Sequence, residues 1–206
     1  MMIAVAGGSG SGKSTIVQMI KSKCDDLDIL VFEQDHYYRD LSQLSVVERA
    51  QQNFDHPEAI DHKLMTSHLL ELASGNAVER PTYDFASHTV TGERVVLQPA
   101  PVIIFDGIFA LYYDNIRPLY DLKIYVDIED DIRLVRRLLR DVEQRGRSMA
   151  GVVDQYLKSV APMHKAYIAP TKAQADLIVR WETRNEAIVN HLARMIKGRV
   201  HDERTS

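Results

Sequence analysis

The sequence predicts an α/β fold in which helices flank a doubly wound, mainly parallel sheet. Short apolar runs alternate with helical patterns along most of the 206 residues, as expected when crossover helices join parallel strands. A glycine-rich loop also stands directly between an apolar run and a helical run near the N-terminus. A chain of this length with 45% hydrophobic residues can form a substantial core, so we expect one domain over residues 1–206.

Several apolar runs are candidates for the strands of this sheet. Each is too short and too apolar to be a half-exposed antiparallel strand. The runs are Ile3–Ala6, Ile29–Glu33, Val102–Phe105, Leu122–Val126 and Leu177–Val179. We therefore expect them to lie side by side in one buried sheet.

Capping residues and apolar stripes predict helices between these strands. One helix is expected to begin after Asp61, a good N-cap, and to end at Gly75. Its apolar stripe comprises Leu64, Met65, Leu69 and Leu72. The other expected helices are Thr15–Lys23, a helix that starts near Asp130, and Glu186–Lys197, which Gly198 ends.

The segment 78–97 breaks the alternation of strands and helices. It is rich in residues that favour strands, and it contains a turn signal at Thr91-Gly92. We therefore expect a β-hairpin that lies outside the main sheet as an appendage of the domain.

Composition argues against several classes of partner. The net charge of -4 and the pI near 6.1 are unsuited to a broad nucleic-acid or membrane surface. No apolar run approaches the roughly 20 residues that span a bilayer, and the N-terminus lacks the basic region of a signal peptide. The single cysteine, Cys24, cannot form an internal disulfide. We expect a cytoplasmic protein without a nucleic-acid or membrane partner.

The glycine-rich loop is a phosphate-binding motif. Its sequence, Gly7-Gly8-Ser9-Gly10-Ser11-Gly12-Lys13-Ser14 followed by Thr15, fits the pattern G-x-x-x-x-G-K-[ST]. Inward-facing N–H groups and the positive end of the next helix suit phosphate oxygens. Lys13 is expected to reach the β- and γ-phosphates, and Ser14 to hold Mg²⁺. The motif predicts binding of a nucleoside triphosphate but leaves the reaction open.

Further motifs identify a family that the chain resembles. The segments are Glu33–Asp40, Asn53–Asp61, Pro81–His88, Asp106–Ile108, Arg136–Asp141, Arg145–Arg147, Gln155-Tyr156 and Pro170–Lys172. In order and spacing, from about Ile3 to Val179, they resemble the uridine kinase (uridine–cytidine kinase) family. The resemblance implies a P-loop kinase fold and transfer of the γ-phosphate of ATP (or GTP) to the 5′-hydroxyl of uridine or cytidine. It also implies Mg²⁺, a homotetramer and feedback inhibition by CTP or UTP.

The resemblance assigns roles residue by residue. Asp35 is the implied general base beside the 5′-hydroxyl, a role that suits phosphoryl transfer. Asp55, with Arg137 and Gln155, is implied to bind the ribose hydroxyls. The residues implied to surround the base are Phe54, Tyr83, Phe85, Ile108 and His88. His88 would read its 4-position, because a neutral imidazole has one donor and one acceptor nitrogen.

An arginine-rich segment, 130–150, is expected to form a helix and a mobile lid. Arg140, Arg145 and Arg147 are implied to close over the transferring phosphoryl group, where bidentate guanidinium donors suit phosphate oxygens. Arg133, Arg136, Arg137 and Arg140 share one helical face. An alternative is a solvated face paired with Asp130, Asp131, Asp141 and Glu143.

The chain departs from the family pattern at two places. Asp106, a candidate magnesium ligand with Ser14, stands where the family commonly has Glu. The loop Arg180-Trp181-Glu182-Thr183 replaces one that contains more glycine, so the residues that contact the donor base stay open.

Other functions fit parts of the sequence. A phosphoribulokinase-like enzyme shares the loop and an aspartate like Asp35, but its sugar-phosphate acceptor would need extra basic residues and no aromatic pair. A non-catalytic sensor of pyrimidine nucleotides would have no use for Asp35. A GTPase switch would need a guanine-reading Asn-Lys-x-Asp motif, which the sequence lacks.

Overall fold

The computed structural model describes residues 1–183 and 185–205. In this part of the chain a parallel sheet has the strand order β2-β5-β1-β6-β7. Its strands are β1 (Met2–Ala6), β2 (Ile29–Glu33), β5 (Val102–Asp106), β6 (Leu122–Asp127) and β7 (Leu177–Arg180). Each contains one of the predicted apolar runs. The doubly wound α/β fold is therefore confirmed.

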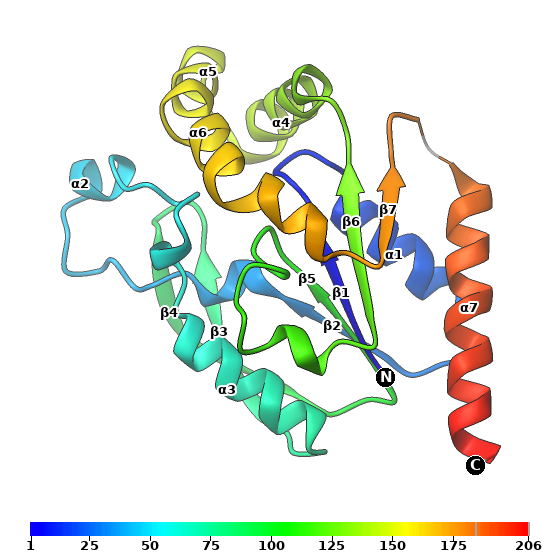
Figure 1. The fold of residues 1–206 in the computed structure, drawn as a ribbon. Helices are drawn as coiled ribbons and strands as arrows, with labels where there is room; N and C mark the ends of the chain where they lie inside the picture. The colour runs from blue at the N-terminus through cyan, green and yellow to red at the C-terminus, as the bar shows by residue number, and fades with distance from the viewer. Residues whose placement is uncertain (184, 206) are drawn as a thin grey trace.

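Helices cover both faces of this sheet (Figure 1). Side chains alternate along a strand, so Ile3 of β1 lies in a core with α1 (Lys13–Lys23) and α7 (Glu186–Thr205). Ala4 faces the opposite core, which includes α3 (His62–Ala73). The middle strand is thus buried on both sides, which explains its unbroken apolar sequence.

The remaining helices lie between these elements in the sequence, and α4, α5 and α6 lie beyond the carboxyl ends of β6 and β7 (Figure 1). The α-helices are α2 (Val46–Ala50), α4 (Asp130–Arg145), α5 (Met149–Gln155) and α6 (Ala161–Met163). The short 3₁₀ or π segments are η1 (Gln34–Tyr37), η2 (Pro57–Ala59), η3 (Arg117–Leu119), η4 (Tyr156–Val160), η5 (His164–Ile168) and η6 (Ala169–Gln174). Pro162 and Pro170 lack a backbone donor, which accounts for the irregular turns around them.

The predicted helix boundaries are partly correct. The Asp61 side chain accepts a hydrogen bond from the Leu64 N–H and caps α3, and Gly75 follows with φ of 85°. Leu64 itself was assigned to the wrong face, because it is 38% exposed whereas Met65 is buried. The predicted end at Gly198 is also wrong. α7 continues to Thr205, since a helix tolerates an interior glycine at a modest cost.

The predicted hairpin forms a separate two-stranded antiparallel sheet. It consists of β3 (Val78–Asp84) and β4 (Thr89–Leu97). The predicted turn at Thr91-Gly92 is wrong, because these residues lie inside β4 opposite a shift in register. The chain turns instead at 85–88, where Asp84 accepts hydrogen bonds from the Ala86 N–H at 2.9 Å and the Ser87 hydroxyl at 2.6 Å.

Membrane-spanning helices are absent from the described residues: none is both long and apolar enough.

Candidate active site

The phosphate loop lies where the sequence predicts it, between β1 and α1. Lys13 is the first residue of α1 and is buried, and its Nζ donates a hydrogen bond to the Gly8 carbonyl at 3.2 Å. Burial lowers the pKa of Lys13, while the nearby carboxylates of Asp106 and Asp35 act in the opposite direction. The buried ammonium group of Lys13 lies beside a loop of N–H donors, so it is well placed to bind phosphate oxygens.

Asp106 ends β5 beside this loop. In the sheet it is paired with Val5 of β1 and with Glu33 of β2, so three strand ends meet here. Its Oδ2 accepts a hydrogen bond from the Ser14 hydroxyl at 2.6 Å. Burial raises the pKa of Asp106, and Lys13 offsets part of that rise. A buried carboxylate that gains from a nearby positive charge suits a cation-binding position.

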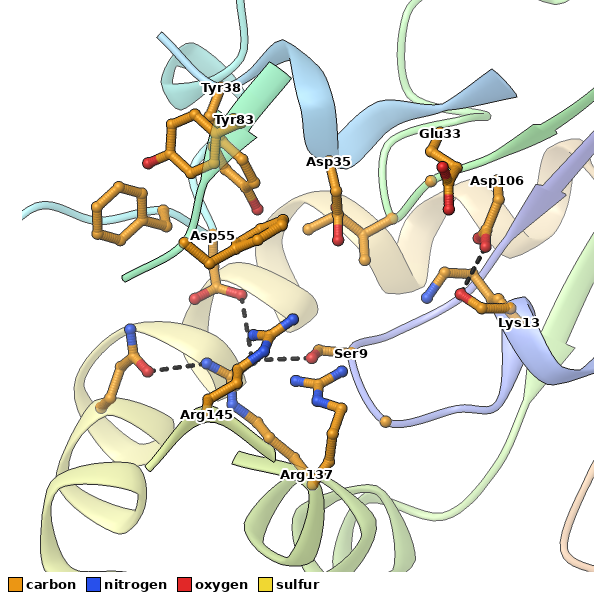
Figure 2. Close-up of a pocket in the computed structure, with 18 of the residues that line it drawn as sticks. Ser9, Lys13, Glu33, Asp35, Tyr38, Asp55, Tyr83, Asp106, Arg137 and Arg145 are labelled. Atoms are coloured by element: carbon orange, nitrogen blue, oxygen red, sulfur yellow. Dashed lines mark hydrogen bonds and ion pairs between the residues drawn. The ribbon is translucent and has the colours of Figure 1, made fainter. Parts of the chain in front are cut away.

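A cavity extends from the phosphate loop to the hairpin (Figure 2). Most predicted site residues line it: Ser9, Gly10, Lys13, Ser14, Asp35, Phe54, Asp55, Tyr83, Phe85, His88, Asp106, Ile108, Arg137, Arg140, Arg145, Arg147 and Gln155. The predicted residues that do not line it are Gly7, Gly8, Ser11, Gly12 and Thr15. These five belong to the turn of the phosphate loop and the start of α1.

Asp35 lies in η1, directly after β2. Figure 2 shows its carboxylate pointing into the cavity, with Tyr38 and Tyr83 on one side and Lys13 on the other. Asp35 therefore lies between the phosphate loop and the aromatic end of the cavity.

Asp55 and its neighbours form a connected polar group. Asp55 is 6% exposed, and one of its oxygens lies 3.9 Å from Nη1 of Arg137. Burial raises the pKa of Asp55, and Arg137 opposes that rise. Arg137 also donates hydrogen bonds to the Ser9 hydroxyl at 2.8 Å and to Gln155 Oε1 at 2.9 Å. Gln155 accepts a second bond from Arg147 at 2.9 Å. The group thus connects the phosphate loop to the far end of the cavity.

Aromatic side chains form the far end of the cavity. Tyr38 lies between Phe54, Tyr83 and Phe85, with ring centroids 5.8, 5.2 and 6.5 Å away. His88 stacks on Phe54 with centroids 4.5 Å apart. These residues come from three separate segments of the chain, and all of them line the cavity. Flat rings of this kind pack well against another planar ring.

His88 closes the hairpin turn in the left-handed conformation, with φ of 56°. Burial lowers its pKa, and Arg147 lowers it further. The imidazole is therefore neutral near pH 7, with one donor and one acceptor nitrogen.

Two arginines of α4 are buried in the protein. Arg133 is 1% exposed and Arg137 is 6% exposed, so the alternative of a solvated arginine face is wrong for these two. The guanidinium of Arg145 lies 5.0 Å from the centre of the Phe85 ring, which ties the end of α4 to the hairpin. α4 ends at Gly146, whose φ of 63° turns the chain back toward Arg147.

The loop after β7 lies beside the phosphate loop. Trp181 is 3% exposed, and a side chain at Gly12 would collide with its ring. Arg136 of α4 donates a hydrogen bond to the Glu182 carbonyl at 2.8 Å.

Three cavity residues were missed from the sequence: Glu33, Tyr38 and Gly107. Glu33 ends β2 and forms an ion pair with Arg80 of the hairpin at 3.5 Å. All three residues lie within the motifs given above. For Glu33, its position at the carboxyl end of a parallel strand was an available signal.

Most of this chain is similar in sequence to known proteins. The model of the Phosphoribulokinase / Uridine kinase family matches residues 2–187. A uridine kinase of Halalkalibacterium halodurans is 41% identical over 203 residues, which cover 98% of this chain and 96% of the relative. A uridine kinase of Staphylococcus haemolyticus is 47% identical over 178 residues, which cover 86% of each chain.

A more distant structure shares the fold. The phosphoribulokinase from Rhodobacter spheroides has a TM-score of 0.63 at 18% identity over 87% of this chain and 69% of its own. At this identity the likeness supports the fold alone, whereas the family rests on the sequence matches. The chain belongs to the phosphoribulokinase / uridine kinase family of kinases.

Proposed function

We propose that this protein transfers the γ-phosphate of ATP, or of GTP, to the 5′-hydroxyl of uridine or cytidine and so produces UMP or CMP for pyrimidine salvage. One observation carries the proposal. A single cavity joins the phosphate loop to an aromatic end, with Asp35 between them. The names of the two bacterial relatives support the acceptor.

Residues at the donor end bind and orient the triphosphate. Lys13 and the N–H groups of the loop hold its phosphates, and Asp35 accepts the proton of the attacking hydroxyl. Arg140, Arg145 and Arg147 stabilise the charge on the phosphoryl oxygens. Because phosphoryl transfer needs mainly positioning and charge stabilisation, these groups suffice for the protein's part of the reaction.

The residues around Ser14 fit Mg²⁺. No group of three or more His, Cys, Asp or Glu side chains suited to a metal occurs among residues 1–183 and 185–205. Mg²⁺ commonly needs only one or two protein ligands beside phosphates and water. Ser14 would bind the ion directly, and Asp106 would do so through water. When bound, the ion neutralises charge on the phosphates.

The acceptor end suits a ribonucleoside. Asp55, supported by Arg137 and Gln155, accepts hydrogen bonds from the ribose hydroxyls. Tyr83 and Phe85 pack around the pyrimidine, with Phe54 and Ile108 completing the walls. His88 faces the 4-position, and a change of tautomer matches either the oxygen of uracil or the amino group of cytosine.

Two other functions are less consistent with this cavity. A phosphoribulokinase-like acceptor has no ring to occupy the aromatic end, and a nucleotide sensor has no use for Asp35. A cytoplasmic homotetramer inhibited by CTP or UTP belongs to the proposal through the family resemblance.

A coupled assay with a panel of acceptors tests this function. Uridine and cytidine should be phosphorylated, first with ATP and then with GTP as donor, whereas ribulose 5-phosphate should not. Phosphorylation of the sugar phosphate, or of neither nucleoside, would overturn the proposal.

A further inference from the structure

Asp141 lies among arginines that border the cavity. It is fully buried in α4, at 0% exposure, although its side chain ends in a carboxyl group. The guanidinium groups within 4 Å of its carboxylate belong to Arg137, Arg140, Arg145 and Arg147. All four arginines line the cavity, and Asp141 does not.

The contacts differ in strength. Arg140 binds Oδ1 with both Nε, at 2.9 Å, and Nη2, at 2.8 Å. Arg145 lies 3.6 Å from Oδ1, while Arg137 and Arg147 lie 3.6 and 3.5 Å from Oδ2. One carboxylate therefore bridges arginines from the helix and from the turn that follows it.

The main chain of Asp141 stabilises the turn that follows α4 at Gly146. Its carbonyl accepts hydrogen bonds from the N–H of Gly146 and, at 3.1 Å, from the N–H of Arg147. These bonds fold the chain after Gly146 back against α4. Arg145 and Arg147 can therefore approach the side chain of Asp141, which lies about one turn earlier in the helix. The side chain and the backbone of Asp141 thus both help to hold the four arginines in place.

Charge explains why such a residue is needed. Four neighbouring guanidinium groups repel one another, and burial lowers the pKa of Arg145, with repulsion from Arg140 adding to the effect. One carboxylate counters part of this repulsion and leaves a positive excess. A guanidinium carries five N–H donors. Among these four arginines only Arg140 donates hydrogen bonds to Asp141, while the others lie 3.5 to 3.6 Å from it, so donors remain for phosphate oxygens.

We propose that Asp141 is a positioning residue that holds Arg140, Arg145 and Arg147 in the geometry that phosphoryl oxygens require, and Arg137 beside Asp55, before the donor binds. The inference rests on the proposed kinase function. It adds a residue that touches neither substrate, and it explains why a carboxylate lies beside a site for anions.

The first test compares Asp141→Asn with the parent. Asparagine keeps the shape of the side chain but removes its charge. We expect kcat to fall about 10- to 100-fold, because small displacements of positioning groups cost that much. The Kd of the non-hydrolysable analogue AMP-PNP should stay equal or decrease, since the site becomes more positive. Glu143→Gln removes an exposed carboxylate from the same helix and should retain the parent kcat.

The second test does not depend on the acceptor. Trypsin cleaves after arginine only when the side chain is free to enter the protease. Cleavage after Arg145 and Arg147, followed by mass spectrometry, should be several-fold faster in Asp141→Asn than in the parent or in Glu143→Gln. Cleavage after Lys21 should stay unchanged, which separates local release from general unfolding.

These outcomes separate the two proposals. If the parent phosphorylates no nucleoside, the proposed function fails, while the trypsin comparison still reports on Asp141. Equal cleavage after Arg145 and Arg147, or a kcat within threefold of the parent in a folded variant, would overturn the role of Asp141.

Discussion

The hydroxyl of Ser14 donates a hydrogen bond to the carboxylate of Asp106, with 2.6 Å between Oγ and Oδ2. The bond joins the phosphate loop to the end of β5, and it orients both proposed magnesium-binding groups. Substituting Asp106 by Ala should raise the Mg²⁺ concentration for half-maximal activity about 10- to 100-fold, as loss of an outer-sphere group does.

Asp106→Glu is the matched variant, because it keeps a carboxylate at this position on a side chain that is one methylene longer. It should require a Mg²⁺ concentration close to that of the parent. A magnesium titration at saturating ATP measures all three proteins, and identical curves would contradict the role of Asp106.

Asp35→Asn should lower kcat by roughly 10²–10⁴, as removal of a general base does, with little change in nucleoside binding. Single-turnover kinetics and calorimetric titration measure the two quantities separately. Lys13→Ala serves as the contrast, since it should weaken binding of the triphosphate as well. If kcat of Asp35→Asn stayed within a few-fold of the parent, Asp35 would not be the base.

Uridine should be preferred over 2′-deoxyuridine in kcat/KM by more than the ~10–200-fold that shape alone provides, and by up to ~10⁴. Asp55 is buried, so a missing hydroxyl leaves it short of a hydrogen bond. Asp55→Ala should shrink this preference. Near-equal values for the two substrates in the parent would exclude Asp55 as the ribose-binding group.

His164 should make stability depend on pH. Its Nδ1 accepts a hydrogen bond from Arg133 at 3.1 Å, and burial, followed by Arg133, lowers its pKa from 6.5 to about 4. Between these pH values the unfolded chain binds a proton that the folded protein does not. The free energy of unfolding should therefore fall on acidification by up to about 1.4 kcal/mol per pH unit, most steeply between pH 6 and 4.

The measurement is urea unfolding from pH 7 to 4 for the parent and His164→Gln, in which this slope should flatten. His191→Gln changes an exposed histidine of α7 and should leave the slope as it is. Parallel pH profiles for the parent and His164→Gln would contradict a neutral His164.

Local sequence patterns predict the sheet well. The runs around Ile3 and Val102 are apolar because their strands are covered on both faces, and burial of this kind is visible without knowing the partners. The phosphate loop is equally local, since its function depends on consecutive backbone groups.

Other features depend on contacts that local patterns do not contain. Thr91-Gly92 has the composition of a turn, but hydrogen bonds to the Asp84 side chain form the turn elsewhere. Gly198 resembles a helix stop, yet packing of α7 against α1 carries the helix through it.

The site also contains residues that local motifs predict and residues whose roles depend on contacts between distant segments. Asp35 and Asp55 were identified through motifs, whereas the part played by Tyr38 emerges only when the hairpin and η1 come together. From the sequence, Asp141 ends a family motif and is one of four acidic partners in the alternative of a solvated helix face. Its contacts with Arg145 and Arg147 require the turn at Gly146, which a helical pattern alone does not describe.

The buried side chain and the backbone of Arg133 restrict which residue types the phosphate loop can contain. The general pattern leaves the residue types at positions 8 and 10 free. Here a methyl group on Gly8 would overlap the guanidinium of Arg133, and one on Gly10 would overlap its carbonyl oxygen. Asp130 and His164 hold that guanidinium, so it cannot swing aside easily. Evolutionary replacement of either glycine would therefore require a compensating change on α4, more than 120 residues away in the chain.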